Sequence, residues 1–289
     1  MWKFSKFLFA TLVVYAAVSA LGVWWATKPY KPTLQADSAT LGFSVEEIEI
    51  RSTDGITLRG WYGHPADAQA VIVIFHGHRA TRSQGLALAR TFVSTGYSVL
   101  MVDFRGCGKS DGSLQTFGVK ESEDVASVLR YLKEQKHSLR RVGIVGIGTG
   151  ASAVILAHQQ ASQCAAIALL GPYSALDRTI GNRLRARLGS NLHPLDTAFE
   201  WMLRYRIGRP LESVRPIDVI GKLAPAPILL AGAMRDSRTP PDEIQEIFER
   251  AEEPKDLYLA HDITRDRLID LNESLLRPKL VTFFDGELR

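Results

Sequence analysis

Cysteine is scarce in this sequence, with Cys107 and Cys164 as the only two among 289 residues. They lie far apart and in no metal-type spacing, so a disulfide framework and a cysteine-based metal site are excluded. A strong excess of one charge is also missing. The formal net charge is only +4, which argues against a dedicated nucleic-acid-binding protein. We therefore expect no metal site and no nucleic-acid partner.

A complete dinucleotide fingerprint is missing as well. The segment GIGTG is followed by Ala151 where the pattern G-x-G-x-x-G needs its third glycine, and no acidic residue follows at the expected strand end. Internal repeats and low-complexity segments are also lacking. We expect no cofactor, and 46% hydrophobic with 23% charged residues is typical of a folded protein.

A long hydrophobic run is present at the N-terminus, uncharged from Phe7 to Ala26. About 20 helical residues span the hydrocarbon core of a bilayer, and tryptophans at the far end are typical of a membrane interface. Residues 1–30 are therefore predicted to be a transmembrane signal anchor in a single-pass protein. The alternative is a signal peptide cleaved near Val18-Ser19-Ala20, but the apolar run continues beyond it. Lysines flank both ends of the run, and the α-amino group beside the N-terminal lysines favours a domain on the non-cytoplasmic side.

The rest of the chain divides into a tether and one domain. Residues 31–44 lack periodicity and are predicted to be a tether. Residues 45–289 begin with a predicted hairpin around Asp54-Gly55 and continue with apolar strands that alternate with helices. This order is typical of an α/β fold with a mostly parallel sheet covered on both faces. The alternation breaks at about 173–222, an Arg-rich segment predicted to form a helical cap. Its arginines are interpreted as a solvated face, with contact to anionic headgroups or an acidic ligand as the alternative.

The segment RVGIVGIGTGASAV, residues 141–154, carries the main functional question. It is predicted to be a strand, a Gly-rich turn and the start of a helix. Ligands of open α/β sheets bind beyond the carboxyl ends of the strands, so residues at this turn are candidates for the site. Its central residue is Gly148, where enzymes with the G-x-S-x-G turn carry a nucleophilic serine.

Several motifs in order resemble the α/β-hydrolase superfamily, over about residues 45–285. They include IFHGH, VDFRGCGKSDGS, GIGTG, RPIDVIGKLAPAPILL and RDSRTPP. The sequence is most similar to membrane-anchored Bem46-like and serine-aminopeptidase-like members. The resemblance implies hydrolysis of ester, amide or peptide bonds by a Ser-acid-His triad, in that chain order.

The resemblance assigns family positions to particular residues. The nucleophile position is Gly148, the acid position is Asp236, and the histidine position is Arg265, with His261 as a possible displaced base. The oxyanion-hole donors would be the backbone N–H groups of Thr149 and of His78 or its neighbour. The family pattern is thus broken at two of three triad positions. A base has no purpose without a hydroxyl to deprotonate, so the two departures agree with each other.

Other nucleophiles are weaker candidates. Thr149 is one residue along the turn and is predicted to begin a helix. Ser152 is predicted to pack against the sheet, and Cys107 to belong to a structural loop. The leading hypothesis is a hydrolase-fold pseudoenzyme that binds a ligand or partner at a membrane. The alternative is an active hydrolase with a rebuilt site, in which His261 or Asp236 activates a water beside Gly148, on an acyl, ester or peptide-like substrate.

Overall fold

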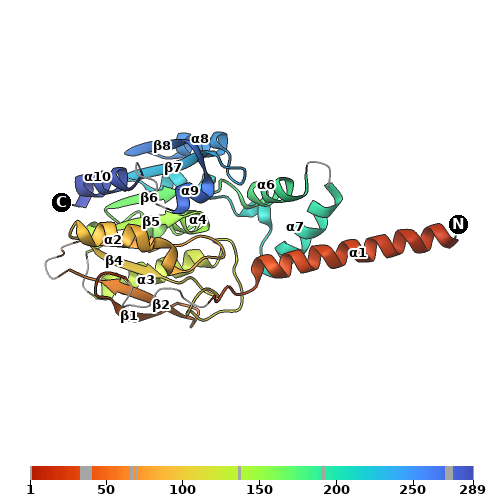
Figure 1. The fold of residues 1–289 in the computed structure, drawn as a ribbon, viewed down its shortest axis with the longest axis horizontal. Helices are drawn as coiled ribbons and strands as arrows, with labels where there is room; N and C mark the ends of the chain where they lie inside the picture. Colours follow the sequence, from red (N-terminus) through yellow and green to blue (C-terminus); the bar gives the residue numbers. More distant parts are fainter. Residues whose placement is uncertain are drawn as a thin grey trace.

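The computed structural model describes residues 2–32, 41–65, 68, 70–135, 138–189, 193–270 and 276–288. The predicted α/β fold is confirmed, because these residues form a sheet of eight strands in the order β1-β2-β4-β3-β5-β6-β7-β8. Strands β3 to β8 are parallel, whereas β1 and β2 form the predicted hairpin and pair antiparallel at one edge. Figure 1 shows the helices lying on both faces of this sheet.

The strands of the centre are short, apolar and buried along their whole length, as parallel strands covered on both faces are. Neighbouring residues of one strand belong to different cores, since Val71 and Val73 face one cluster while Ile72 and Ile74 face the other. The strands are β1 (Glu46–Arg51), β2 (Thr57–Gly63), β3 (Val71–Phe75), β4 (Ser98–Val102), β5 (Val142–Ile147), β6 (Ala166–Leu170), β7 (Ile228–Arg235) and β8 (Lys255–Thr264).

Apolar faces of the helices fill the two cores. The first core takes residues from α3 (Glu121–Glu134), α4 (Thr149–Leu156), α5 (His158–Ala161) and α8 (Pro241–Arg250). The second takes residues from α2 (Leu86–Ser94), α9 (Arg265–Asp270) and α10 (Leu276–Leu288). Short 3-10 helices connect the elements: η2 (Arg82–Gly85), η3 (Leu139–Arg141), η4 (Leu211–Ser213), η5 (Pro216–Asp218) and η6 (Ile220–Leu223).

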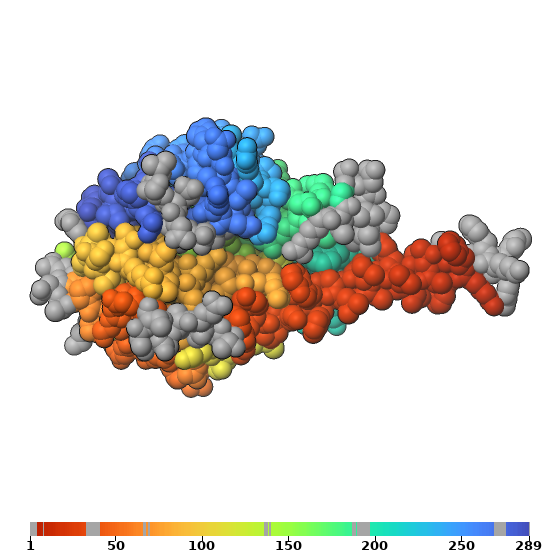
Figure 2. Space-filling model, viewed as in Figure 1, coloured from red at the N-terminus to blue at the C-terminus, as the bar shows by residue number. Residues whose placement is uncertain are grey.

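A third apolar cluster joins the N-terminal helix to a helical insertion. Helix α1 (Trp2–Thr27) contributes Val23, and α6 (Leu176–Leu188) and α7 (His193–Ile207) contribute residues that include Ile180 and Leu203. We call the insertion α6 to η4 the cap. Figure 1 shows α7 beside the C-terminal part of α1, and Figure 2 shows the rest of α1 projecting from the body.

Helix α1 is long and apolar enough to cross a membrane over Ser5–Thr27, by length and composition. Its projecting part exposes large apolar side chains, which include Phe7, Phe9 and Leu12. Most of the predicted tether, residues 33–40, lies outside the described residues. Just before it, Tyr30 pairs with the loop after β4 through a bridge to Cys107.

Candidate functional site

A cavity of about 770 Å³ lies beyond the carboxyl ends of the central strands. Its floor is the turn between β5 and α4, and its walls come from the loop after β3, from the cap and from α1. The residues that line it are Val18, Ser19, Gly22, Trp25, Ala26, Gly77, His78, Arg79, Ala80, Gln84, Phe117, Gly148, Thr149, Ile180, Arg183, Leu184, Ala186, Phe199, Ser237, Arg238, Arg265 and Asp266. Its size is typical of a small-molecule site.

The turn under the cavity has the strained geometry of a nucleophile elbow. Gly148 adopts φ 57° and ψ −115° between β5 and α4, a region that residues with a side chain rarely occupy. The flanking glycines let the helix approach the sheet closely. A Cβ on Gly150 would lie 2.5 Å from the carbonyl oxygen of His76, and one on Gly146 would lie 2.5 Å from the Cα of Ala151. The chain therefore keeps the elbow and lacks the nucleophilic side chain.

Arg265 lies directly above this elbow. It is the first residue of α9, at the end of β8, and it is buried. Its Nη1 donates to Asp236 Oδ2 at 2.8 Å and to Thr239 Oγ1 at 3.3 Å, and its Nη2 donates to the carbonyl of Gly171 at 2.9 Å. The guanidinium is thus held in one place by three contacts.

This guanidinium occupies the space next to the nucleophile position. A Cβ built on Gly148 would lie 2.8 Å from Arg265 Nη2. This distance is shorter than a normal van der Waals contact, so the guanidinium would have to move to admit a side chain. The structure therefore brings together the residues that stand at the nucleophile, acid and histidine positions of the sequence prediction. They form an ion pair beside a glycine, so the nucleophile position supplies no hydroxyl and the histidine position supplies no imidazole.

The carboxylate of Asp236 is fully engaged. Besides Arg265, it accepts the backbone N–H groups of Arg238 at 2.8 Å and Thr239 at 3.0 Å on Oδ1. Its side chain is 1% exposed. Asp236 therefore both hydrogen-bonds the backbone of the turn that follows it and forms an ion pair with Arg265.

The structure does not bring His261 to the site. It lies within β8, is exposed, and is not among the residues that line the cavity. The strand continues past it to Thr264, so Arg265 rather than His261 is at the strand's carboxyl end. The next residue, Asp262, has a positive φ of 58°, which marks an irregularity of the backbone here.

The two positions predicted to donate to an oxyanion both border the cavity. Thr149 is the first residue of α4, so its N–H has no partner within the helix. On the other side, the N–H groups of Gly77 and Arg79 donate to the side chains of Gln84 and Gln115. Of this short segment, only the N–H of His78 remains as a candidate donor. Two donors could still hold an oxygen of a ligand.

The His78 side chain connects the domain to α1. Its Nε2 lies 2.8 Å from the carbonyl of Ala26, and its ring stacks on Phe117 with centroids 4.4 Å apart. Burial lowers the pKa of His78 to about 3, and the positive charges of Arg183, Arg79 and Arg238 add to this effect. The imidazole is therefore neutral, with Nε2 as the donor to Ala26.

The depressed pKa of His78 predicts a loss of stability in mild acid. The pKa of His78 is 6.5 in the unfolded chain and about 3 in the folded chain. At a pH between these two values, His78 is protonated in the unfolded chain and neutral in the folded chain. Stability is full above this window and falls through it, by at most about 1.4 kcal/mol per pH unit. We expect His78→Gln to reduce the fall in melting temperature between about pH 7.5 and pH 5. The exposed His64→Gln should leave the fall unchanged, and equal curves for all three proteins would contradict the prediction.

The cysteines and Ser152 are structural. Burial raises the pKa of the Cys107 thiol well above its usual value, and Glu121, Asp103 and Asp124 raise it further. Burial also raises the pKa of Cys164 to about 12. Ser152 accepts the N–H of Tyr173 on its Oγ at 2.9 Å, as expected for a packing residue. The thiols therefore stay protonated and are poor nucleophiles.

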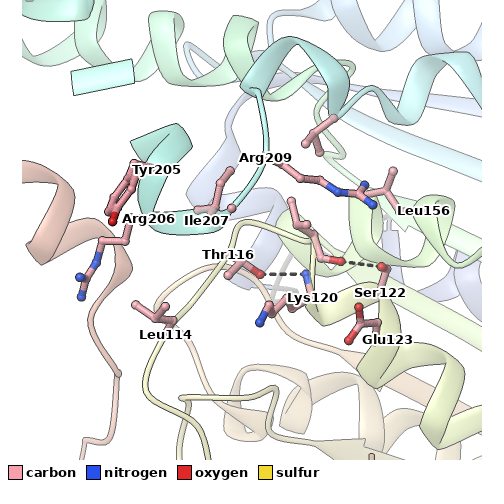
Figure 3. Close-up of a pocket in the computed structure, with 13 residues that line it drawn as sticks. Leu114, Thr116, Lys120, Ser122, Glu123, Leu156, Tyr205, Arg206, Ile207 and Arg209 are labelled. Carbon is pink, nitrogen blue, oxygen red and sulfur yellow. Dashed lines mark hydrogen bonds between the residues drawn. The ribbon is translucent and has the colours of Figure 1, made fainter. Parts of the chain in front are cut away.

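A second hollow of about 480 Å³ lies between α3, the end of α7 and the loop before α3. Figure 3 shows that two of its hydroxyls are used locally, because Thr116 Oγ1 accepts the N–H of Lys120 and Ser122 Oγ donates to the carbonyl of Val119. Thr116 also donates to Glu121 at 2.6 Å. Within the described residues, no three His, Cys, Asp or Glu side chains are placed to hold a metal ion. The cavity over Gly148 is therefore the better candidate.

The contribution of α1 to the cavity was missed from the sequence. Five residues of this helix line the cavity, namely Val18, Ser19, Gly22, Trp25 and Ala26. A Cβ on Gly22 would lie 3.2 Å from the ring of Phe199 in α7, so a small residue permits the close approach. A glycine within an apolar run is the signal that could have indicated helix packing.

A family model and several curated proteins match this chain. The model of the X-Pro dipeptidyl-peptidase (S15 family) matches residues 21–186, more than half of the chain. That range includes Gly148 and ends before Asp236 and Arg265. The uncharacterized protein YqkD of Bacillus subtilis is 27% identical over 84% of this chain and 82% of its own length. The protein Bem46 of Schizosaccharomyces pombe is 25% identical over 70% of this chain and 64% of its own length.

Solved structures share the fold. An esterase of Pyrococcus furiosus superposes with a TM-score of 0.75 at 23% identity, covering 91% of this chain and 99% of that one. The α/β hydrolase GrgF of a Penicillium species gives a TM-score of 0.68 at 20% identity, over 85% of this chain and 99% of that one. These likenesses confirm the α/β-hydrolase fold, which the sequence motifs had predicted.

Proposed function

This chain belongs to the X-Pro dipeptidyl-peptidase (S15) family, and we propose that it is a membrane-anchored member without serine hydrolase activity that binds a ligand in the cavity over Gly148. The matching family model is named for a peptidase, and similar solved structures are named as esterases. In this chain the pocket would hold a ligand without cleaving it.

One observation carries the proposal. Arg265, paired with Asp236, stands against Gly148 where the family's chemistry needs a histidine against a serine. A guanidinium stays protonated at every pH at which proteins fold, so it cannot take a proton from a nucleophile. Removing the nucleophile of a triad leaves only about 10³–10⁴ over the uncatalysed rate, from binding and the oxyanion hole.

In the described part of the chain, neither candidate base of the rebuilt-site alternative is placed to act. A water beside Gly148 would need a base, yet Asp236 is engaged by three donors and His261 is exposed in β8. Anchoring by α1 rests on the length and composition of its apolar span, with the domain proposed to lie on the non-cytoplasmic side.

The test is hydrolysis of a panel of p-nitrophenyl esters and X-Pro p-nitroanilides by the purified full chain, across pH. Asp236→Asn and His261→Ala serve as paired controls. We expect the wild type, both variants and the buffer blank to agree. Turnover that either substitution abolishes would overturn the proposal and would establish a rebuilt catalytic site.

A further inference from the structure

We propose that the cavity over Gly148 binds a single-chain amphiphile with an anionic headgroup, which enters from the bilayer beside α1. This inference rests on the proposed function, in which α1 is a membrane anchor and the elbow is not catalytic. Four observations support it: the wall formed by α1, the attachment of α1 to the rim, the charge of the lining, and two buried hydroxyls.

The membrane helix itself forms a wall of the cavity. The C-terminal part of α1 lines it, while the preceding turns project from the body (Figure 2) and expose apolar side chains, which include Val14 and Leu21. Val18 is both 54% exposed and part of the lining. An apolar chain in the bilayer could therefore pass along α1 into the cavity without crossing water.

The end of α1 is tied to the rim of the cavity. Its last carbonyl groups accept hydrogen bonds from the domain, which is how exposed helix ends are satisfied. The donors are His78 Nε2 to Ala26 at 2.8 Å, Arg79 Nη1 to Trp25 at 2.9 Å, and the N–H of Gln115 to Thr27 at 2.8 Å. Arg206 Nε donates to Thr27 Oγ1 at 2.6 Å. The cavity is thereby held at a fixed position relative to the end of the apolar span.

The charge of the lining favours an anion. Arginine side chains line the cavity from the β3 loop, the cap, the β7 loop and α9, and the described lining holds one acidic residue, Asp266, which lies 3.8 Å from Arg238. Arg265 is balanced by Asp236 beneath it. Counted over the described lining together with Asp236, four arginines face two carboxylates, so positive charge predominates, and the neutral His78 adds none. The N-terminus of α4 at the elbow also favours negative charge.

Two buried hydroxyls face the same cavity from different walls. Ser19 in α1 is 3% exposed and Thr149 at the elbow is 5% exposed. Within the described part of the chain, neither Ser19 Oγ nor Thr149 Oγ1 has a hydrogen-bond partner. Buried hydroxyls are normally paired, so both are suited to oxygens of a carboxylate or phosphate headgroup. The apolar part of the lining, with Phe117, Ile180, Leu184 and Phe199, suits the chain.

The experiment measures displacement of dansylaminoundecanoate from the full chain in phosphatidylcholine nanodiscs, with empty nanodiscs subtracted. The competitors share one chain length: dodecanoate, dodecyl phosphate and uncharged dodecanol. The variant Arg183→Gln removes a charge of the lining, and Thr149→Val removes a hydroxyl. Arg209→Gln is the matched control, because Arg209 lies in the other hollow and outside this cavity. Melting curves confirm that each variant is folded.

We expect the tighter-binding of the two anions to displace the probe at a concentration about tenfold lower than dodecanol. The anion that binds more tightly identifies the headgroup as a carboxylate or a phosphate. We expect Arg183→Gln to lower the affinity for this anion at least about fivefold, and Thr149→Val replaces it if Arg183→Gln does not fold. The affinity of Arg209→Gln should stay within about twofold of wild type. No saturable binding, equal affinity for dodecanol, or an equal loss in Arg209→Gln would overturn the inference. Hydrolysis of p-nitrophenyl dodecanoate in the same samples would instead overturn the proposed function, so the two failures are distinguishable.

Discussion

Changing Gly148 to serine and Arg265 to histidine together is expected to raise ester hydrolysis by about 10²–10⁴ over either single variant, the usual contribution of a general base. The serine would supply the hydroxyl that the elbow lacks. The histidine would stand beside Asp236 in place of the guanidinium that now donates to it at 2.8 Å. Initial rates on p-nitrophenyl acetate and butyrate measure the gain.

The single variants test why both changes are needed. Gly148→Ser alone places a Cβ 2.8 Å from Arg265 Nη2, so we expect it to stay inactive and to melt at a lower temperature. Arg265→His alone has no nucleophile to activate. Adding Asp236→Asn to the double variant should remove most of the gain, because the imidazole then loses the group that orients it. A Gly148→Ser protein as active as the double variant would show that Arg265 does not block the site.

Removing the Arg265 guanidinium is expected to destabilise the fold by about 3–5 kcal/mol, because a buried carboxylate loses its partner. The side chains of Asp236 and Arg265 are only 1% and 9% exposed, so solvent screens this ion pair weakly. The change is Arg265→Met, and the measurement is denaturant unfolding of the wild type and variant.

A double-mutant cycle separates the ion pair from general damage. The double variant Arg265→Met/Asp236→Asn should lose less stability than the sum of the two single losses, because it leaves no unpaired charge of this pair in the protein. The matched control is Arg178→Met, which breaks a pair with Glu246 whose side chains are 46% and 38% exposed, and we expect it to cost below about 1 kcal/mol. A cost for Arg265→Met as small as this would mean that the pair is not a structural element.

The elements that the sequence predicted best are those with strong local patterns. The apolar runs of β3 to β6, the Asp54-Gly55 hairpin and the order of the motifs sufficed to predict the sheet and its α/β-hydrolase fold. Counting from the last strand also indicated Arg265 rather than His261 as the residue at the histidine position. In the structure β8 extends past His261 to Thr264, so Arg265 directly follows the strand.

Contacts between distant segments could not be predicted in this way. Nothing in the local pattern around Arg265 shows that its guanidinium reaches Asp236 and Gly171, since these bonds span 29 and 94 residues of sequence. The same holds for α1, which was predicted as an anchor and also forms a wall of the cavity. Its apolar surface suits both lipid and the cap, so composition alone cannot assign each face.

The most direct test of the central claim is covalent labelling of the wild-type full chain with a fluorophosphonate, mapped by mass spectrometry. The reagent captures hydroxyl nucleophiles that a base has activated. We predict no labelled residue in the cavity of the wild type, and labelling at position 148 in the Gly148→Ser/Arg265→His protein. Labelling of the wild type at Thr149, Ser237 or any other residue of the cavity, lost in Asp236→Asn, would contradict the account.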